Sequence, residues 1–149
     1  MQKCTLALGC FWKPEENFKN KPGILETEVG YAGGKSPNVT YEEICNGDTG
    51  HAEVVKLTFN EQVTNYEKIL DLFFKMHDPT QKDMQFPDVG SQYRSEIFYE
   101  NEDQKLTAIK IKKKFNKEYE GKVETNISKI YNYCKAEEYH QKYIEKNKR

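Results

Sequence analysis

The chain has 149 residues, the size of one ordinary domain, and its 23 basic and 24 acidic side chains leave a formal net charge of −1. Charge of one sign is concentrated only within 110–117, so electrostatics favours neither a nucleic acid nor a membrane as partner, and a small neutral substrate or a protein segment fits better. Four irregularly spaced cysteines, with no secretory leader and no bilayer-spanning apolar stretch, predict free thiols, no metal site and a cytoplasmic protein.

The first part of the sequence predicts two strands separated by one helix. Residues 4–8 form a short apolar run that is typical of a buried strand. A helix is expected over 13–19, and Pro22 with Gly23 ends it. Residues 25–32 follow as a second strand. One face of this strand is predicted to carry Leu25, Thr27, Val29 and Tyr31.

Two Thr-x-x-Glu sequences predict helix starts, because the threonine and glutamate side chains bond reciprocally to free backbone N–H groups. They are Thr40 with Glu43 and Thr64 with Glu67. The first opens a short helix, and the second opens a helix over 66–76 that carries a buried apolar stripe. The segment 52–59 between them is predicted to be a strand.

The last part of the chain begins with residues 80–93, which lack periodicity and are expected to form a long binding loop. The elements predicted after it are a strand over 95–99, a lysine-rich helix over 102–119, a strand around 123–127 and a helical tail from Ala136. Helices that alternate with about five strands predict an α/β layered architecture. We expect residues 1–149 to form a single catalytic domain.

Cys10 lies in Gly9-Cys10-Phe11-Trp12, where the first predicted strand leads into the first predicted helix. A thiol at that turn is directed into the positive end of the helix, which favours the thiolate. A structural core residue is the alternative, because free cysteine is among the most buried residue types. The turn, the preceding glycine and the two aromatic neighbours favour a nucleophile.

Glu53 lies on the predicted strand 52–59, on the same face as the apolar Val55, Leu57 and Phe59. An ionised carboxylate on such a face is costly, so Glu53 either tips outward at the strand end or keeps its proton near neutrality. A protonated carboxyl near a reactive thiol can donate a proton to a leaving oxygen. We therefore predict Glu53 as the general acid.

The remaining polar candidates are Asp88 and Tyr93 from the long loop and Tyr41 near the first capping box. Taken alone, Asp88 is explained by a local turn with Gly90, and Tyr93 by ordinary core packing. Taken together, the three side chains offer a carboxylate and two phenolic hydroxyls to a polar group bound in an aromatic pocket.

Four motifs stand in one order along the chain. They are Gly9-Cys10-Phe11-Trp12, Gly50-His51-Ala52-Glu53, Asp88-Val89-Gly90-Ser91-Gln92-Tyr93-Arg94-Ser95 and Ala136-Glu137-Glu138-Tyr139-His140-Gln141. Their order and spacing resemble the A class of peptide methionine sulfoxide reductases. The resemblance implies a two-layer α/β sandwich with a ferredoxin-like mixed sheet core. It also implies reduction of the S epimer of methionine sulfoxide, free or in proteins, without a metal or organic cofactor.

The resemblance also implies a mechanism that agrees with the roles inferred from the residues. Cys10 attacks the sulfoxide sulfur and is left as a sulfenic acid when methionine departs. Glu53, helped by Tyr41 and Tyr93, protonates the oxygen, which without a proton is too basic to leave.

For substrate binding, the resemblance implies that Phe11 and Trp12 form an apolar wall for the substrate methyl group. Asp88 would hold the polar end of the substrate or its water. The sequence departs from the family pattern at Lys13, where a glycine is usual, and at Met84 and Phe86, where Arg and Gly are more frequent.

Recycling of the sulfenic acid is the step that the sequence leaves open. The family's recycling cysteine usually lies in a C-terminal tail, and no cysteine follows Cys134 in this chain. Cys134 is the best internal candidate, although a cysteine near tyrosines is more often incidental, and Cys45 is expected to do no chemistry. Otherwise a thioredoxin-like protein or a small thiol must act directly on Cys10.

Two rival functions belong to other classes. A cysteine hydrolase or transferase would pair Cys10 with His51 or His140 as base, although a surface position is the default for His140. A non-catalytic reader of oxidised or aromatic peptides would keep the aromatic pocket and would not need Cys10. Neither rival explains why a thiol at a turn, a carboxylate on an apolar face and a long loop occur together.

Overall fold

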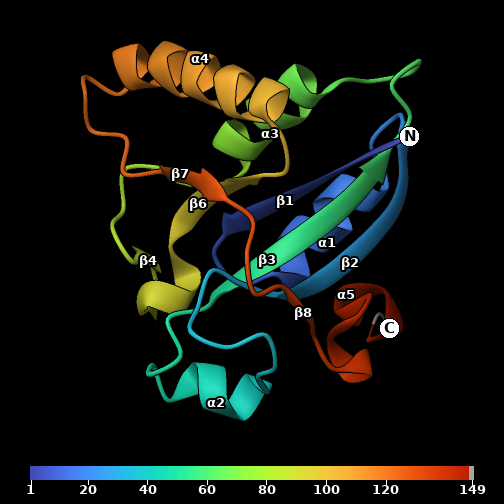
Figure 1. Ribbon diagram of the computed structural model, residues 1–149, viewed down its shortest axis with the longest axis vertical. Coiled ribbons are helices and arrows are strands. Elements are labelled where there is room, and N and C mark those ends of the chain that lie inside the picture. The colour runs from blue at the N-terminus through green and yellow to red at the C-terminus, as the bar shows by residue number, and fades with distance from the viewer. Residues whose placement is uncertain (148–149) are drawn as a thin grey trace.

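The computed structural model describes residues 1–147, in which strands and helices alternate along the chain (Figure 1). The strands are β1 Gln2–Leu8, β2 Ile24–Ala32, β3 Ala52–Phe59, β4 Met84–Gln85, β5 Asp88–Val89, β6 Ser95–Tyr99, β7 Asn126–Lys129 and β8 Cys134–Lys135. The helices are α1 Trp12–Lys19, α2 Tyr41–Cys45, α3 Tyr66–Met76, α4 Glu102–Glu118 and α5 Tyr143–Lys146. Two short 3-10 helices, η1 Ser91–Tyr93 and η2 Glu138–His140, complete the order.

Six of the strands form one mixed sheet in the order β7-β6-β1-β3-β2-β8. Strands β6 and β7 run parallel, and the other neighbours in the sheet run antiparallel. The strands β4 and β5 form a separate hairpin within the long loop. The predicted mixed α/β sheet is therefore confirmed, while the order of its strands is new information from the structure.

The two faces of the sheet are covered differently. One face joins the main hydrophobic core, in which the strand residues Val55, Leu57 and Phe59 meet buried side chains of the helices. The buried helical residues are Phe18, Ile69, Leu70, Phe73, Phe74, Ala108, Ile111 and Phe115. The other face carries a small cluster that Ile130 and Tyr133 cover from the segment before β8. The helical layer thus lies on the face that also carries Glu53.

The register of the sheet brings distant parts of the chain to one rim. Leu8, at the end of β1, pairs with Ser95 at the start of β6. Tyr31, near the end of β2, pairs with Glu53 near the start of β3. Since Cys10 follows β1 directly, the segments that carry the nucleophile, the acid and the long loop meet at this rim.

Two local predictions in the first half of the chain are corrected. Helix α3 is capped by Asn65, whose side chain accepts from the backbone N–H of Lys68 at 2.8 Å, and not by the predicted Thr64 capping box. The Thr40 capping box that begins α2 is confirmed. In β2, the register of pairing shifts between Ile24 and Glu26. Leu25 therefore leaves the predicted face of the strand, and 49% of its surface is exposed.

The second half of the chain differs from prediction at its connections. The loop over 80–93 is ordered by the β4–β5 hairpin and by η1. The strand expected around 123–127 is β7, which begins only at Asn126. The tail predicted as helical starts with the strand residues of β8 and continues as the short turns η2 and α5.

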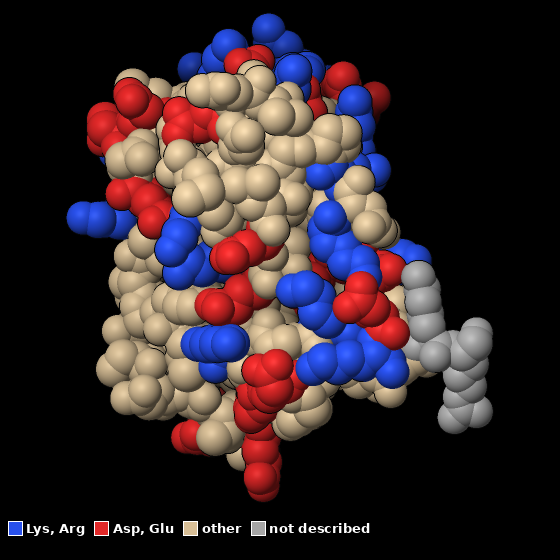
Figure 2. Space-filling model, turned by 90° about the vertical axis from the view of Figure 1, so that its right-hand side faces the viewer, with Lys and Arg blue, Asp and Glu red and all other residues tan. Residues whose placement is uncertain are grey.

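Charge is mixed on the molecular surface. On the face shown in Figure 2, basic and acidic side chains intermingle over the middle and lower parts. Residues 1–147 contain no helix with the length and apolar character needed to cross a bilayer. Within the same residues, no group of three or more metal-ligating side chains is placed to hold an ion.

Candidate active site

Cys10 occupies a tight turn between β1 and α1, as predicted. Gly9 adopts φ +98°, and a Cβ at this position would lie 2.9 Å from Cγ of Gln85 in the β4–β5 hairpin. Only glycine combines this backbone conformation with so close an approach. The turn leaves Cys10 half-buried, with the backbone N–H of Trp12 donating to its sulfur.

The helix end acts on the Cys10 thiol in the predicted direction, but burial outweighs its effect in the resting protein. Burial is the largest influence on the Cys10 thiol and raises its pKa to about 12. The N–H of Trp12 lowers the pKa, but the nearby carboxyls of Glu53 and Asp88 raise it again. One backbone donor therefore does not compensate for desolvation and two acidic neighbours, and Cys10 is protonated at neutral pH.

Glu53 is the buried acid of the site. Its side chain is 1% exposed, and its Oε1 accepts from the backbone N–H of Phe11 at 3.3 Å. Burial raises the pKa of Glu53 to about 8, the Phe11 N–H lowers it, and Asp88 raises it. The second oxygen, Oε2, is buried and has no hydrogen-bond partner among the described residues. Glu53 is thus a neutral acid at pH 7 with one oxygen available, directly beside the residue that follows Cys10.

Asp88, Tyr93 and Tyr41 surround this pair. Tyr93 interacts electrostatically with Glu53, Asp88 and Cys10, and Tyr41 interacts with Glu53 and Tyr93. All three side chains are half-buried, so they lie between the core and the surface. Burial raises the pKa of Tyr93 to about 12 and also raises the pKa of Tyr41, so both hydroxyls keep their protons and can donate hydrogen bonds.

The two aromatic residues after Cys10 differ in exposure. Phe11 is 1% exposed, and its ring centroid lies 5.7 Å from that of Tyr31. Trp12 is half-buried and stacks on Tyr143, with ring centroids 3.8 Å apart. Phe11 therefore belongs to the core beneath the site, while the indole of Trp12 lies at its surface.

Two residues of the C-terminal segment are part of the site's surroundings, in contacts that the sequence analysis did not predict. His140 was expected at the surface, but it is 1% exposed and accepts from Nε1 of Trp12 at 2.9 Å. The carboxylate of Glu137 accepts from the Tyr31 hydroxyl and from the backbone N–H of Tyr41, both at 2.8 Å. Both residues belong to the fourth sequence motif, which was the only sign in the sequence that they matter. Their roles could not be inferred, because the residues that they contact lie about a hundred positions away in the chain.

The pairing of Cys10 with a histidine base, which the rival hydrolase function requires, is absent from the described residues. Nε2 of His51 lies 2.7 Å from the carbonyl oxygen of Ser36, and its Nδ1 has no partner. In His140, Nδ1 is occupied by Trp12 and Nε2 has no partner. Neither imidazole bonds to the sulfur, as a hydrolase of this type requires.

The other cysteines lie apart from Glu53 and Cys10, which we call the acid–thiol pair. All four cysteines, which lie among the described residues, are free thiols. Cys134 is in β8 opposite Tyr31, so strand β2 separates it from the strand of Glu53. Its thiol lies 3.6 Å from the carbonyl oxygen of Val39. The Cys45 thiol is hydrogen-bonded to the hydroxyl of Tyr41.

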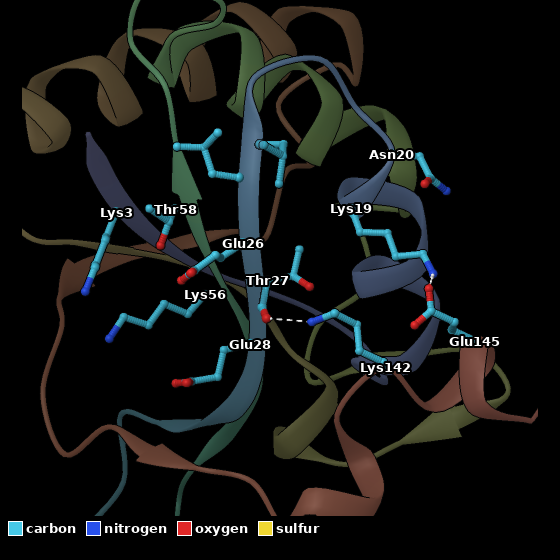
Figure 3. A pocket seen from close by; sticks show the side chains of 12 residues that line it. Lys3, Lys19, Asn20, Glu26, Thr27, Glu28, Lys56, Thr58, Lys142 and Glu145 are labelled. Atoms are coloured by element: carbon cyan, nitrogen blue, oxygen red, sulfur yellow. Dashed lines mark hydrogen bonds and ion pairs between the residues drawn. The ribbon is translucent and has the colours of Figure 1, made fainter.

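A separate hollow of about 610 Å³ follows β2, with side chains of β1 and β3 on one side and of α1 and the C-terminal segment on the other (Figure 3). Charged side chains such as Lys19, Lys142 and Glu145 line it, and none of the predicted site residues takes part. Figure 3 shows two of the bonds there, from Lys142 to the Thr27 carbonyl and between Lys19 and Glu145. These bonds fasten the C-terminal segment to β2 and α1.

Comparison with known proteins shows similarity over nearly the whole chain. The family model described as peptide methionine sulfoxide reductase matches residues 2–149. The peptide methionine sulfoxide reductase MsrA of Pelagibacter ubique is 53% identical over 146 residues, covering 98% of this chain and 99% of the relative. Mxr1 from Saccharomyces cerevisiae in reduced form superposes with a TM-score of 0.94 at 39% identity, covering 98% of this chain and 85% of the other.

A further structure, of Mxr1 in complex with Trx2, has a TM-score of 0.68 at 27% identity and covers 95% of this chain and 84% of that one. The matches to the family model and to the first relative span nearly the whole chain, and the range matched by the family model contains the positions of all four sequence motifs. The chain therefore belongs to the peptide methionine sulfoxide reductase family.

Proposed function

We propose that this chain is a peptide-methionine (S)-S-oxide reductase, which converts methionine-S-sulfoxide, free or in proteins, to methionine at the expense of thiols. The observation that carries the proposal is the contact of Glu53 with the backbone N–H of Phe11, which holds a neutral carboxyl beside Cys10. Family membership supports the reaction class. Residues 1–149 act as a single catalytic domain, and the proposed chemistry uses no metal ion or organic cofactor.

The first step transfers one oxygen atom from the substrate to Cys10. The sulfur of Cys10 attacks the sulfoxide sulfur, Glu53 gives its proton to the oxygen, and the resulting carboxylate takes up the thiol proton. The attack forms an S–S bond between Cys10 and the substrate, and the substrate S–O bond breaks as the protonated oxygen leaves as hydroxide. The hydroxide then adds to the Cys10 sulfur, the S–S bond breaks to release methionine, and a new S–O bond remains on Cys10. The substrate sulfur gains two electrons and Cys10 loses two, so the products are methionine and a sulfenic acid.

Substrate recognition follows from the surroundings of this pair. The buried Oε2 of Glu53 has an unused position for the sulfoxide oxygen, and the hydroxyl of Tyr93 donates to the same oxygen. The hydroxyl of Tyr41 joins it by exchanging its bond to the Cys45 thiol for one to the substrate. Trp12 offers apolar surface to the methyl group, Phe11 supports this wall from the core, and Asp88 binds the polar end of the substrate or its water. With the oxygen and the methyl group each held in a fixed place, only one epimer turns its sulfur toward Cys10 while its remaining carbon chain leads out of the pocket.

The sulfenic acid is returned to a thiol by an external reductant, either a thioredoxin-like protein or a small thiol. The reductant first forms a mixed disulfide with Cys10 and releases water, and a second thiol then releases Cys10. The known complex of Mxr1 with Trx2 supports a redoxin as partner. The four free thiols suit a reducing compartment, and we place the protein in the cytoplasm.

A single turnover followed by intact mass measurement tests the reaction and the role of Cys134 together. With one equivalent of the S epimer and no reductant, we expect the protein to gain one oxygen, because β2 separates Cys134 from the acid–thiol pair and a disulfide needs Cα atoms within about 7 Å. The R epimer should leave the mass unchanged. Loss of two hydrogens, absent in Cys134→Ser, would instead establish Cys134 as the recycling thiol.

The rate of the first step is expected to fall as the pH rises above about 8. Glu53 must be protonated to donate, and its raised pKa of about 8 means that the protonated form predominates at pH 6 to 7. Above that pKa, the protonated fraction of Glu53 falls tenfold for each pH unit. Single-turnover rates across this range provide the measurement. Alkylation of Cys10 should accelerate over the same range, and a sulfoxide reduction rate that rises with it would contradict the proton-donor role.

A further inference from the structure

The indole of Trp12 is held by two residues of the C-terminal segment. Its Nε1 donates to Nδ1 of His140 at 2.9 Å, and its ring stacks on Tyr143 with an interplanar angle of 9°. Trp12 itself is only half-buried, whereas His140 is 1% exposed. A partly exposed side chain is thus fixed by a bond to a core residue.

The bond to Trp12 determines the protonation of His140. Indole Nε1–H can only donate, so Nδ1 of His140 must be unprotonated, and the neutral ring carries its proton on Nε2. Burial lowers the pKa of His140, which favours this neutral form, although Glu137 nearby acts in the opposite direction. His140 therefore serves as a permanent acceptor for the indole at physiological pH.

The segment that supplies His140 is itself firmly anchored. The side chain of Gln141 bonds to the backbone N–H and carbonyl of Val29 at 2.9 and 2.8 Å, as a neighbouring strand would. The backbone N–H of Lys142 donates to the buried carboxylate of Glu15 at 2.7 Å. Through these bonds, the segment that holds the indole is fixed to β2 and α1.

We propose that His140 is a positioning residue that fixes the indole of Trp12 against the methyl group of the sulfoxide substrate. The inference rests on the proposed function, which gives Trp12 its contact with substrate. His140 acts through Trp12 and does not touch the reacting atoms. Because the indole is already fixed, substrate binding does not include the entropic cost of ordering a mobile side chain.

The first test compares two substitutions of His140, one that removes the hydrogen-bond acceptor for Trp12 and one that keeps an acceptor. His140→Phe keeps an aromatic ring against its neighbours but removes the acceptor, whereas His140→Asn places an amide oxygen close to the position of Nδ1. We expect His140→Phe to raise KM about fivefold with little change in kcat, the size of effect that one hydrogen bond gives. His140→Asn should recover most of the loss. An unchanged KM in His140→Phe, in an active parent enzyme, would overturn the inference.

A double-mutant cycle separates this role from general packing, because His140 also contacts the rings of Tyr41 and Phe11, with centroids at 4.4 and 5.2 Å. In a Trp12→Phe background the indole donor is absent, so adding His140→Phe should change KM by less than about twofold. An equal penalty in both backgrounds would show that His140 acts through the other rings and would refute the proposal.

Trp12 is the only tryptophan of the chain, so its fluorescence reports this contact without substrate. Time-resolved anisotropy should show a rigid indole in the parent and in His140→Asn, and nanosecond wobble in His140→Phe. Equal rigidity in the parent and His140→Phe would contradict the inference. A parent that keeps its indole rigid but reduces no sulfoxide would refute the proposed function alone, so the two failures are distinguishable.

Discussion

Replacing Cys10 by serine is expected to abolish sulfoxide reduction, with a loss of more than about 10⁴-fold. A serine hydroxyl is a poor nucleophile toward sulfur and cannot take up the oxygen as a stable sulfenic acid, so the two-electron transfer has no acceptor. The side chain is nearly isosteric, and the N–H of Trp12 that meets the sulfur can equally meet an oxygen. Methionine released per mole of enzyme in a single turnover measures the effect.

The same variant separates the proposal from its rivals. Cys10→Ser should retain its thermal midpoint and still bind the S epimer, read from the fluorescence of Trp12, so the loss is chemical. Unchanged reduction in Cys10→Ser would end the proposal. A parent enzyme that binds the sulfoxide without turning it over would favour a reader of oxidised peptides. Cleavage of an acyl substrate by the parent would favour a cysteine hydrolase.

Changing Glu53 to glutamine should slow the first step by about 10² to 10⁴-fold while KM stays nearly constant. The amide still accepts from the backbone N–H of Phe11 and still bonds to a sulfoxide oxygen, so binding survives. What it lacks is a transferable proton, and the oxygen must then leave as a strongly basic anion. Single-turnover rates with the S epimer at pH 7 are the appropriate measurement.

The control for Glu53→Gln is the reactivity of Cys10 itself. The carboxyl of Glu53 raises the pKa of the thiol, so its removal should leave alkylation of Cys10 equal or faster. If alkylation slowed in parallel with reduction, Glu53 would be acting on the thiol and not on the leaving oxygen. Glu26→Gln, an exposed position on β2, provides the matched variant in which neither rate should change.

The parts of the fold that depend on local sequence were predictable. Alternation over 52–59 placed Glu53 on the core face, because successive strand residues point to opposite sides whatever the neighbours are. The Thr40 box formed for the same reason, since all its partners lie within one turn. Where two local signals competed, at Thr64 and Asn65, the sequence could not decide, and the asparagine formed the cap.

The parts that depend on distant contacts were not predictable from one sequence. The order of strands in the sheet is set by pairing between segments far apart, and so is the burial of His140. The Cys10 thiol illustrates the same limit, because the helix end was visible in the sequence while the burial that outweighs it was not. The proximity of Cys10 and Glu53 emerged only through the register that joins β1, β3 and β6.

The contact of Gly9 with Gln85 has a practical consequence for redesigning the enzyme toward bulkier sulfoxides. Because a Cβ on Gly9 would lie 2.9 Å from Cγ of Gln85, a side chain at position 9 would press on the hairpin that carries Asp88. Libraries that vary Gly9 would therefore disturb the loop of the nucleophile and this hairpin together. Phe86 and Val89, which are 77% and 68% exposed on that hairpin, are the positions where diversity can be introduced without moving the chemistry.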